Sequence, residues 1–253
     1  AKTIDTLVIT HANGDHHYGS QLVEGAEIIC SKACAEELDE TPPELLAGMV
    51  KGAPDMGDLG KYVTHCFSAF DFEGITPLKP TRTFEKRLDI KCGATEVQLI
   101  EVGPTHTIGD AIVFIPEAKA VFAADILFIG GTPIMWIGPV ENWINACDLM
   151  LDLDADKFVP GHGPITDKAG VEKFKGYWTY VRAEAKKRFE DGLSVADAIE
   201  SIDLGEYASW GDSERIAVNV HSLFKQFSGD TTPDNTVELF GSMTSLWLKQ
   251  SAQ

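Results

Sequence analysis

Positive charge is scarce in this chain of 253 residues. It contains 21 lysines and arginines against 39 aspartates and glutamates, which gives a formal net charge of −18 and a pI near 4.7. Proteins that bind nucleic acid need clustered lysine and arginine to contact the phosphates. The charge balance therefore argues against nucleic acid as a partner.

Long apolar runs and paired cysteines are also lacking. No hydrophobic run approaches the length of a membrane span and no signal peptide is visible, so we expect no membrane partner. The five cysteines are odd in number and form no CxxC pair, which favours unpaired thiols in a reducing cytoplasm. The chain opens at Ala1 without a methionine, so an N-terminal signal removed by processing stays an alternative.

The remaining composition is typical of a globular protein. A hydrophobic content of 44% and a chain of 253 residues suffice for one large domain with a substantial core. We expect a single domain over residues 1–253, in which residues 166–253 form a helical extension packed on the rest. Amphipathic spacing and capping residues predict the helices of this extension over 169–191, 195–202, 213–227 and 237–248. Asn219 and His221 are interpreted as satisfied helix residues.

The densest polar motif lies between residues 11 and 17, directly after the apolar, strand-like run 6–10. It contains His11, Asn13, Asp15, His16 and His17. Neutral imidazole and carboxylate are the groups that hold zinc and similar divalent ions in proteins. Polar residues also collect at strand ends where no metal binds, but this density of ligand types favours a metal site.

Three later fragments place further ligand types after strand-like runs. His106 lies in residues 103–110 after the run 97–102, Asp125 follows 120–124, and His162 lies in 160–164 after 157–159. In this order the chain resembles the metallo-β-lactamase superfamily. The signature of that superfamily is His-x-His-x-Asp-His, then His, Asp and His, each at the end of a strand. The resemblance covers about residues 5–165.

This resemblance implies an α/β fold, a four-layer αβ/βα sandwich with the sheets inside and the helices outside. The metal site would lie at one edge of the two sheets, where the four fragments meet. The family normally places several strands and a β-hairpin before the first motif. Because this chain reaches the motif at residue 11, we expect the fold without those N-terminal strands and with a helical C-terminal cap.

The resemblance also implies two groups of metal ligands that share a bridging aspartate. The first group would be His11, position 13 and His106, the second would be Asp15, His16 and His162, and Asp125 would bridge them. Position 13 holds Asn13 where the signature has histidine, and an amide oxygen is a weaker zinc ligand than imidazole. His17 is expected to point elsewhere. Zinc, as one or two ions, is the expected cofactor, with iron or manganese as alternatives.

The activity implied is hydrolysis of a small-molecule ester, thioester, lactone or amide, and β-lactam hydrolysis stays open. A divalent metal lowers the pKa of bound water from about 15.7 towards 7, and Asp15 would orient the resulting nucleophile and shuttle its proton. A polyketide-type cyclase or lyase, and a non-catalytic scaffold with a degraded metal site, are the alternatives. The charge disfavours the nuclease branch, and Asn13 disfavours the flavin-linked di-iron branch, which carries a carboxylate there. Assembly into a homo-oligomer is left open.

Two segments are expected to lie beside the metal site. Residues 40–80 are rich in proline and glycine and are predicted to be irregular, either as a lid or as a loop whose phenylalanines pack onto the domain. His65 and Cys66 of this segment lie outside the signature and are not assigned as ligands. Residues 129–139 are predicted to form a loop near Asp125, with Trp136 either lining the pocket or packed in the core.

Alternating and apolar runs predict the remaining elements. Strands are expected over residues 26–30, 84–90, 96–102, 111–115 and 120–124, and a helix over 143–151. Residues 92–94 and 116–119 would join neighbouring strands as tight turns. Asp125 would then close the last of these strand pairs.

Overall fold

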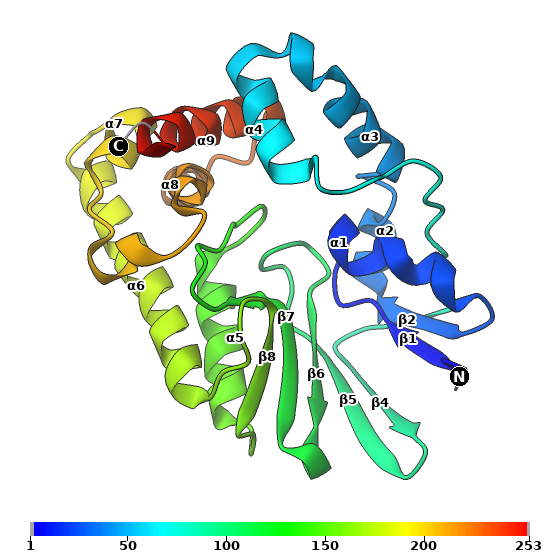
Figure 1. Cartoon of the computed structure of the whole chain (residues 1–253). Coiled ribbons are helices and arrows are strands. Elements are labelled where there is room, and N and C mark those ends of the chain that lie inside the picture. Colours follow the sequence, from blue (N-terminus) through cyan, green and yellow to red (C-terminus); the bar gives the residue numbers. More distant parts are fainter. Residues whose placement is uncertain (1–2, 252–253) are drawn as a thin grey trace.

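The computed structural model describes residues 3–251, which fold around two sheets (Figure 1). The first sheet has three parallel strands in the order β1-β2-β3, namely β1 (Thr6–Val8), β2 (Glu27–Ser31) and β3 (Arg82–Phe84). Leu7 of β1 pairs with Ile28 of β2. Because β1 ends at Val8, it delivers the motif of residues 11–17 to one edge of the sheet.

The second sheet has five strands in the order β4-β5-β6-β7-β8. They are β4 (Arg87–Cys92), β5 (Thr95–Glu101), β6 (Ala111–Ile115), β7 (Ala120–Phe128) and β8 (Lys157–His162). Neighbouring strands are antiparallel except β7 and β8, which are parallel. Leu99 of β5 lies opposite Leu88 of β4 and Val113 of β6. The predicted pairing of residues 96–102 and the predicted hairpin around residues 116–119 are therefore confirmed.

Three apolar clusters separate four layers of structure. Ile28, on one face of β2, packs with Cys34 of α2 (Lys32–Glu37). Ile29, on the opposite face of the same strand, packs with Leu99 between the two sheets. A third cluster buries the other face of the second sheet beneath helices. The predicted αβ/βα sandwich is confirmed, and its physical basis is the period of two along each strand.

Helices dominate the second half of the chain. They are α5 (Val140–Asp152), α6 (Lys168–Glu190), α7 (Val195–Ser201), α8 (Ile216–Ser228) and α9 (Thr236–Ser251). Helices α5 and α6 cover the outer face of the second sheet (Figure 1), where the rings of Trp143 and Trp178 lie 4.4 Å apart. The Ser194 side chain caps α7 by accepting a hydrogen bond from Asp197 N. The helices predicted for the C-terminal extension are confirmed.

The prediction of an irregular segment over residues 40–80 is wrong for its first part. Residues 43–67 form α3 (Pro43–Gly52), a short 3-10 turn and α4 (Gly57–Phe67). Proline is tolerated at the first turn of a helix, where its missing N–H has no partner to lose, so Pro43 begins α3 instead of breaking it. Tyr62 and Val63 of α4 are buried, so tertiary packing outweighs the glycine content of this stretch.

The single strand predicted over residues 84–90 is also wrong. The structure divides it between β3 in the first sheet and β4 in the second. Lys86, with φ of 62°, lies between the two strands. A residue in the left-handed region reverses the local backbone direction, which lets the chain leave one sheet and enter the other.

Shorter elements complete the described residues. They are α1 (Gly14–His17) and the 3-10 turns η1 (Tyr18–Val23), η2 (Ala53–Asp55), η3 (Pro116–Ala118), η4 (Gly205–Ser209) and η5 (Ser213–Arg215). Among residues 3–251, no helix is both long enough and apolar enough to span a membrane.

Candidate metal centre

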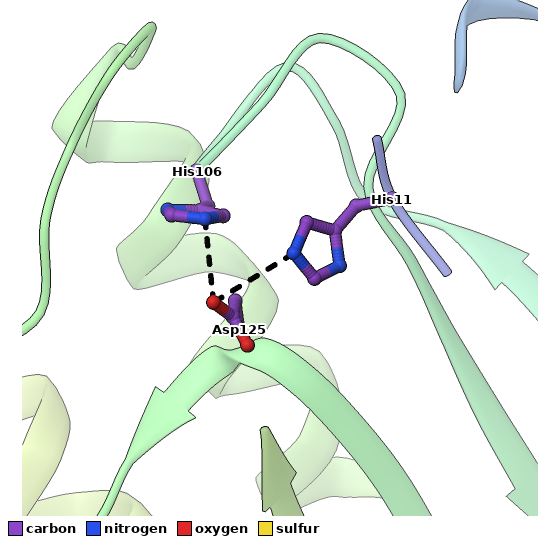
Figure 2. A group of neighbouring side chains, drawn as sticks. All are labelled: His11, His106 and Asp125. Atoms are coloured by element: carbon purple, nitrogen blue, oxygen red, sulfur yellow. Dashed lines mark ion pairs between the residues drawn. The ribbon is translucent and has the colours of Figure 1, made fainter. Parts of the chain in front are cut away.

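Six of the predicted ligands meet at one edge of the two sheets in two groups. The buried group is His11, His106 and Asp125, and the exposed group is Asp15, His16 and His162. Within each group the candidate ligand atoms all lie within 4.8 Å of one another. Figure 2 shows the buried group, in which both imidazole rings point at the Asp125 carboxylate.

The exposed group and the buried group draw on different elements. Asp15 and His16 lie on α1, and His162 is the last residue of β8. His11 follows β1, and His106 lies in the loop between β5 and β6. These positions agree with the prediction that the ligands gather where strands end.

Asp125 is the exception, because it lies inside β7 and does not close it. Ala124, with φ of 47°, precedes it, and the pairing of β7 with β8 shifts register on both sides of Ala124. Such an irregularity re-aims a side chain while the strand continues. Gly161 of β8 makes room for the carboxylate, since a Cβ there would lie 1.9 Å from Asp125 Oδ1.

The Asp125 carboxylate is close to all four histidines. Its Oδ2 lies 3.3 Å from Nε2 of both His106 and His162 and 3.7 Å from Nε2 of His11. Its Oδ1 lies 3.1 Å from Nε2 of His16. Two atoms that bind one tetrahedral zinc at 2.0–2.1 Å are separated by about 3.3 Å. The observed spacing therefore fits ligands of a shared cation.

Several of these buried polar atoms have no hydrogen-bond partner among residues 3–251. They are His11 Nε2, His16 Nε2 and Asp125 Oδ1. Leaving a buried polar atom unpaired costs free energy, and native proteins rarely do so without a reason. Divalent cations held by the two groups, with Asp125 shared between them, would satisfy all three atoms, so the residues present fit a metal site.

Burial sets the protonation of the buried group. It lowers the pKa of His11 to about 3 and also lowers the pKa of His106. Burial alone would raise the pKa of Asp125, but the adjacent histidines outweigh it and hold that pKa well below its usual value. Both histidines are therefore neutral and Asp125 is ionised, which are the forms that bind metal.

Neighbouring carboxylates set the protonation of the exposed group. Burial opposes the charged form of His16, but Asp125 and Asp15 outweigh it and raise the pKa of His16 to about 10. Asp125 likewise raises the pKa of His162. For Asp15, partial burial is outweighed by His16, and its pKa is lowered. Metal binding to this group would displace protons from its histidines.

The loop that carries His106 is held by two buried carboxylates that the sequence analysis missed. Asp110 accepts hydrogen bonds from Thr107 N and Oγ1, both at 2.8 Å, and burial raises the pKa of Asp110 to about 8. Glu37 accepts from Ile108 N at 3.1 Å and Gly109 N at 3.0 Å. The Thr-x-x-Asp spacing at 107–110 was a local signal for the hydrogen bonds of Asp110. No pattern in the sequence near Glu37 indicated its contact with this loop.

The structure brings Asn13 to the site, whereas His17 and His65 lie outside both ligand groups. Asn13 Nδ2 lies 2.8 Å from His106 Nε2, beside the buried group. His17 is buried against Tyr18, with ring centroids 4.8 Å apart, and belongs to neither ligand group. His65 lies against Trp247 at 4.9 Å. Neither His17 nor His65 belongs to a ligand group, as expected from the sequence.

A divalent-cation centre on an αβ/βα sandwich is thus the class of site that the fold defines. The chain matches the family model described as the metallo-beta-lactamase superfamily over residues 1–162, and it belongs to that superfamily.

Two curated relatives resemble part of the chain. One is a 2,4-dinitroanisole O-demethylase subunit alpha from Nocardioides sp., 30% identical over 52% of this chain and 38% of the relative. The other is a beta-lactamase-like protein 2 homolog from Caenorhabditis elegans, 29% identical over 60% of this chain and 50% of the relative. The matched regions thus span half or less of either relative.

Solved structures support the fold over nearly the whole chain. An inverting sec-alkylsulfatase from Pseudomonas sp. superposes with a TM-score of 0.64 at 12% identity, over 94% of this chain and 44% of the other. A metallo-beta-lactamase family protein from Thermus thermophilus gives 0.60 at 16% identity, over 92% and 78%. At such identities the likeness concerns the fold alone.

Proposed function

We propose that the protein is a metal-dependent hydrolase of small organic molecules that contain an ester, thioester, lactone or amide. The observation that carries this proposal is the pair of ligand groups joined by Asp125, one buried and one open to solvent. Superfamily membership supports the same class of activity. Zinc is the proposed metal, because imidazole and carboxylate ligands suit it.

The chain's own residues would divide the work. A bound divalent cation supplies an acidified water and polarises the substrate carbonyl. Asp15, half exposed and 3.5 Å from His162 Nε2, would accept and pass on a proton at the solvent side of the centre. Phe128 stacks on His162 with ring centroids 4.9 Å apart, which restrains the orientation of that ligand.

Aromatic side chains indicate what kind of organic group the site would accept. A chain of rings runs from Tyr18, just after α1, through Phe72, Phe67 and Phe240 to Trp136, with centroids 6.2–6.5 Å apart. It thus begins beside the first motif and ends two residues after Ile134, whose carbonyl bonds to His106. Through Phe67 and Phe240 it links α4 with α9, which lie side by side in Figure 1. Trp136 packs against Phe240 and is half-buried.

These rings support a substrate with an aromatic or other flat apolar group, because such groups prefer stacked or edge-to-face contact with aromatic side chains. One relative is named for 2,4-dinitroanisole, which is an aromatic compound. We therefore include an aryl ether beside carbonyl substrates in the proposed tests.

The experiment is a substrate panel on protein loaded in turn with zinc, manganese and iron. Aryl esters, thioesters, lactones, anilides, a cephalosporin and 2,4-dinitroanisole are each paired with an aliphatic analogue, and bound metal is measured by elemental analysis. We expect metal-dependent turnover and a preference for the aryl member of a pair. Protein that takes up no metal and is inert to the whole panel would instead favour the scaffold alternative.

A small molecule is therefore the proposed partner, and the net charge of −18 disfavours nucleic acid. All five cysteines are free in the described part of the chain, which supports a reducing compartment such as the cytoplasm.

A further inference from the structure

The C-terminal extension holds the backbone of residues 130–135 through six hydrogen bonds. Gly211 bonds to Gly130 O and Thr132 N at 3.0 and 2.8 Å. Arg215 Nη1 donates to Thr132 O at 3.0 Å, and Ser222 Oγ donates to Met135 O at 3.0 Å. This loop links β7 to α5 and passes directly beside the metal centre.

Asn219 of α8 makes the two remaining bonds and is fully buried. Its Oδ1 accepts from Met135 N at 2.9 Å, and its Nδ2 donates to Pro133 O at 2.8 Å and to Tyr177 Oη at 2.9 Å. Both amide hydrogens and the carbonyl oxygen are thus used. The two contacts to the loop fall on either side of Ile134.

The carbonyl of Ile134 faces the other way and accepts a hydrogen bond from His106 Nδ1 at 2.7 Å. A carbonyl oxygen can only accept, so Nδ1 carries the proton. In the neutral ring, Nε2 then carries the lone pair, and this atom accepts a hydrogen bond from Asn13 Nδ2 at 2.8 Å and lies 3.3 Å from Asp125 Oδ2. The Ile134 carbonyl therefore selects the tautomer of His106 that can bind a metal.

We propose that Asn219 is a positioning residue for the metal centre. By fixing the backbone on both sides of Ile134, it holds the carbonyl that sets the tautomer and orientation of His106. The C-terminal extension, which lies outside the residues 1–162 matched by the family model, thereby sets the metal affinity of the buried group. This inference rests on the metal centre of the proposed function.

The first test reads the tautomer in metal-free protein. Imidazole ¹⁵N spectra of histidine-labelled protein should show His106 protonated at Nδ1 and bare at Nε2. In Asn219→Ala, both amide contacts to the loop are lost, and we expect the His106 signals to shift towards a mixture of tautomers. Because no metal is present, this readout is independent of whether the protein is a hydrolase.

The second test measures zinc affinity by competition with a chelating dye, at a temperature where every variant is folded by circular dichroism. Loss of an outer-shell contact to a metal-binding histidine typically weakens metal affinity by 10–100-fold. We expect about tenfold for Asn219→Ala, near the lower end of that range because it acts through Ile134. Ser222→Ala removes one loop contact and should shift zinc affinity in the same direction by less.

Ser194→Ala is the matched control. It removes the cap of α7, also in the C-terminal extension, but has no bond to residues 130–135. It should lower stability and leave zinc affinity and the His106 tautomer unchanged. A similar loss of affinity in Ser194→Ala would overturn the proposal, because the effect would then be one of general stability.

Folded Asn219→Ala with wild-type zinc affinity and wild-type His106 signals would also overturn it. If Asn219→Ala does not fold, Ser222→Ala decides by the same two readouts. If the wild-type protein binds no zinc, the proposed function fails at that point, and the tautomer measurement alone decides the role of Asn219.

Discussion

The two ligand groups share Asp125 but differ in almost every other property. The side chains of the buried group are at most 3% exposed, whereas those of Asp15, His16 and His162 are between 18% and 55% exposed. Burial lowers the pKa values of His11 and His106, and carboxylates raise those of His16 and His162. The buried group is thus held by desolvation in the protonation states that bind metal, and the exposed group is open to solvent and to protons.

The difference follows from how each group is supported. His106 lies on a loop held by Glu37, Asp110 and the Ile134 carbonyl, and His11 Nδ1 lies 3.1 Å from Thr10 Oγ1. The exposed group comes from α1, a helix of four residues, and from the end of β8. A rigid group suits tight binding, whereas a less constrained group suits exchange of water and substrate.

Replacing Asp125 should weaken metal binding in both groups, and we expect this to be the largest effect. Asp125→Asn removes the charge that four histidines share, so both groups should lose metal affinity by more than about 100-fold, beyond the cost of outer-shell changes. Metal content after dialysis and turnover of the best panel substrate should fall together.

Asp148→Asn is a suitable control for this variant, because Asp148 on α5 pairs with Lys175 and belongs to neither ligand group. It should keep both metal and activity. Full metal occupancy and full turnover in Asp125→Asn would remove Asp125 from the site.

Apart from the shared Asp125, the buried group has two ligands and the exposed group has three, so an added imidazole should reduce this difference. Asn13 lies beside His106 where the family signature has histidine, and imidazole binds zinc more strongly than an amide. Asn13→His should therefore raise the metal count per chain when zinc is limiting, with an affinity gain of about tenfold at the buried group. Calorimetric titration measures both quantities.

Asn13→Ala is the comparison variant, because it removes the amide without adding a ligand. It should not raise the metal count. Two tightly held metals in the unmodified protein would show that Asn13 already serves as an adequate ligand.

The two groups should also give the metal-free protein opposite responses to pH. The folded pKa of His11 is about 3 against an ordinary 6.5, so between these values the unfolded chain binds the extra proton and stability falls as pH falls. The folded pKa of His16 is about 10, so its contribution is complete below pH 6.5 and is lost as pH rises towards 10. Urea unfolding across this pH range measures the free energy of unfolding, and with it the decline at low pH and the decline at high pH.

The variant His16→Gln separates the acid decline in stability from the alkaline decline. The variant should show a shallower alkaline decline in stability, with the remainder due to His162, and should keep the acid decline because His11 is unchanged. An alkaline decline as steep as in the wild type would show that another group causes it.

The smallest effect expected is on polyanion binding. The net charge of −18 opposes the approach of a phosphate backbone. We expect no measurable affinity for DNA or RNA at moderate salt by fluorescence anisotropy. Micromolar binding with a steep salt dependence would revive the nuclease alternative.

Much of the centre could be predicted because its signals are local. His11, Asp15 and His16 share one short motif after a strand, and His106 and His162 each follow an apolar run. Alternation of buried residues along a strand depends on only a few neighbours, so pattern sufficed to predict most strands, whereas the sandwich and the ligand groups were implied by the resemblance to the superfamily.

The tertiary structure decided what depends on distant partners. Asp125 reaches the site because Gly161 lets β8 approach an irregular β7, and residues 84–90 divide because two sheets compete for them. Glu37 meets the His106 loop across 71 positions of sequence, and Asn219 meets Met135 across 84. No local pattern encodes such contacts, because they form only when packing brings separate elements together.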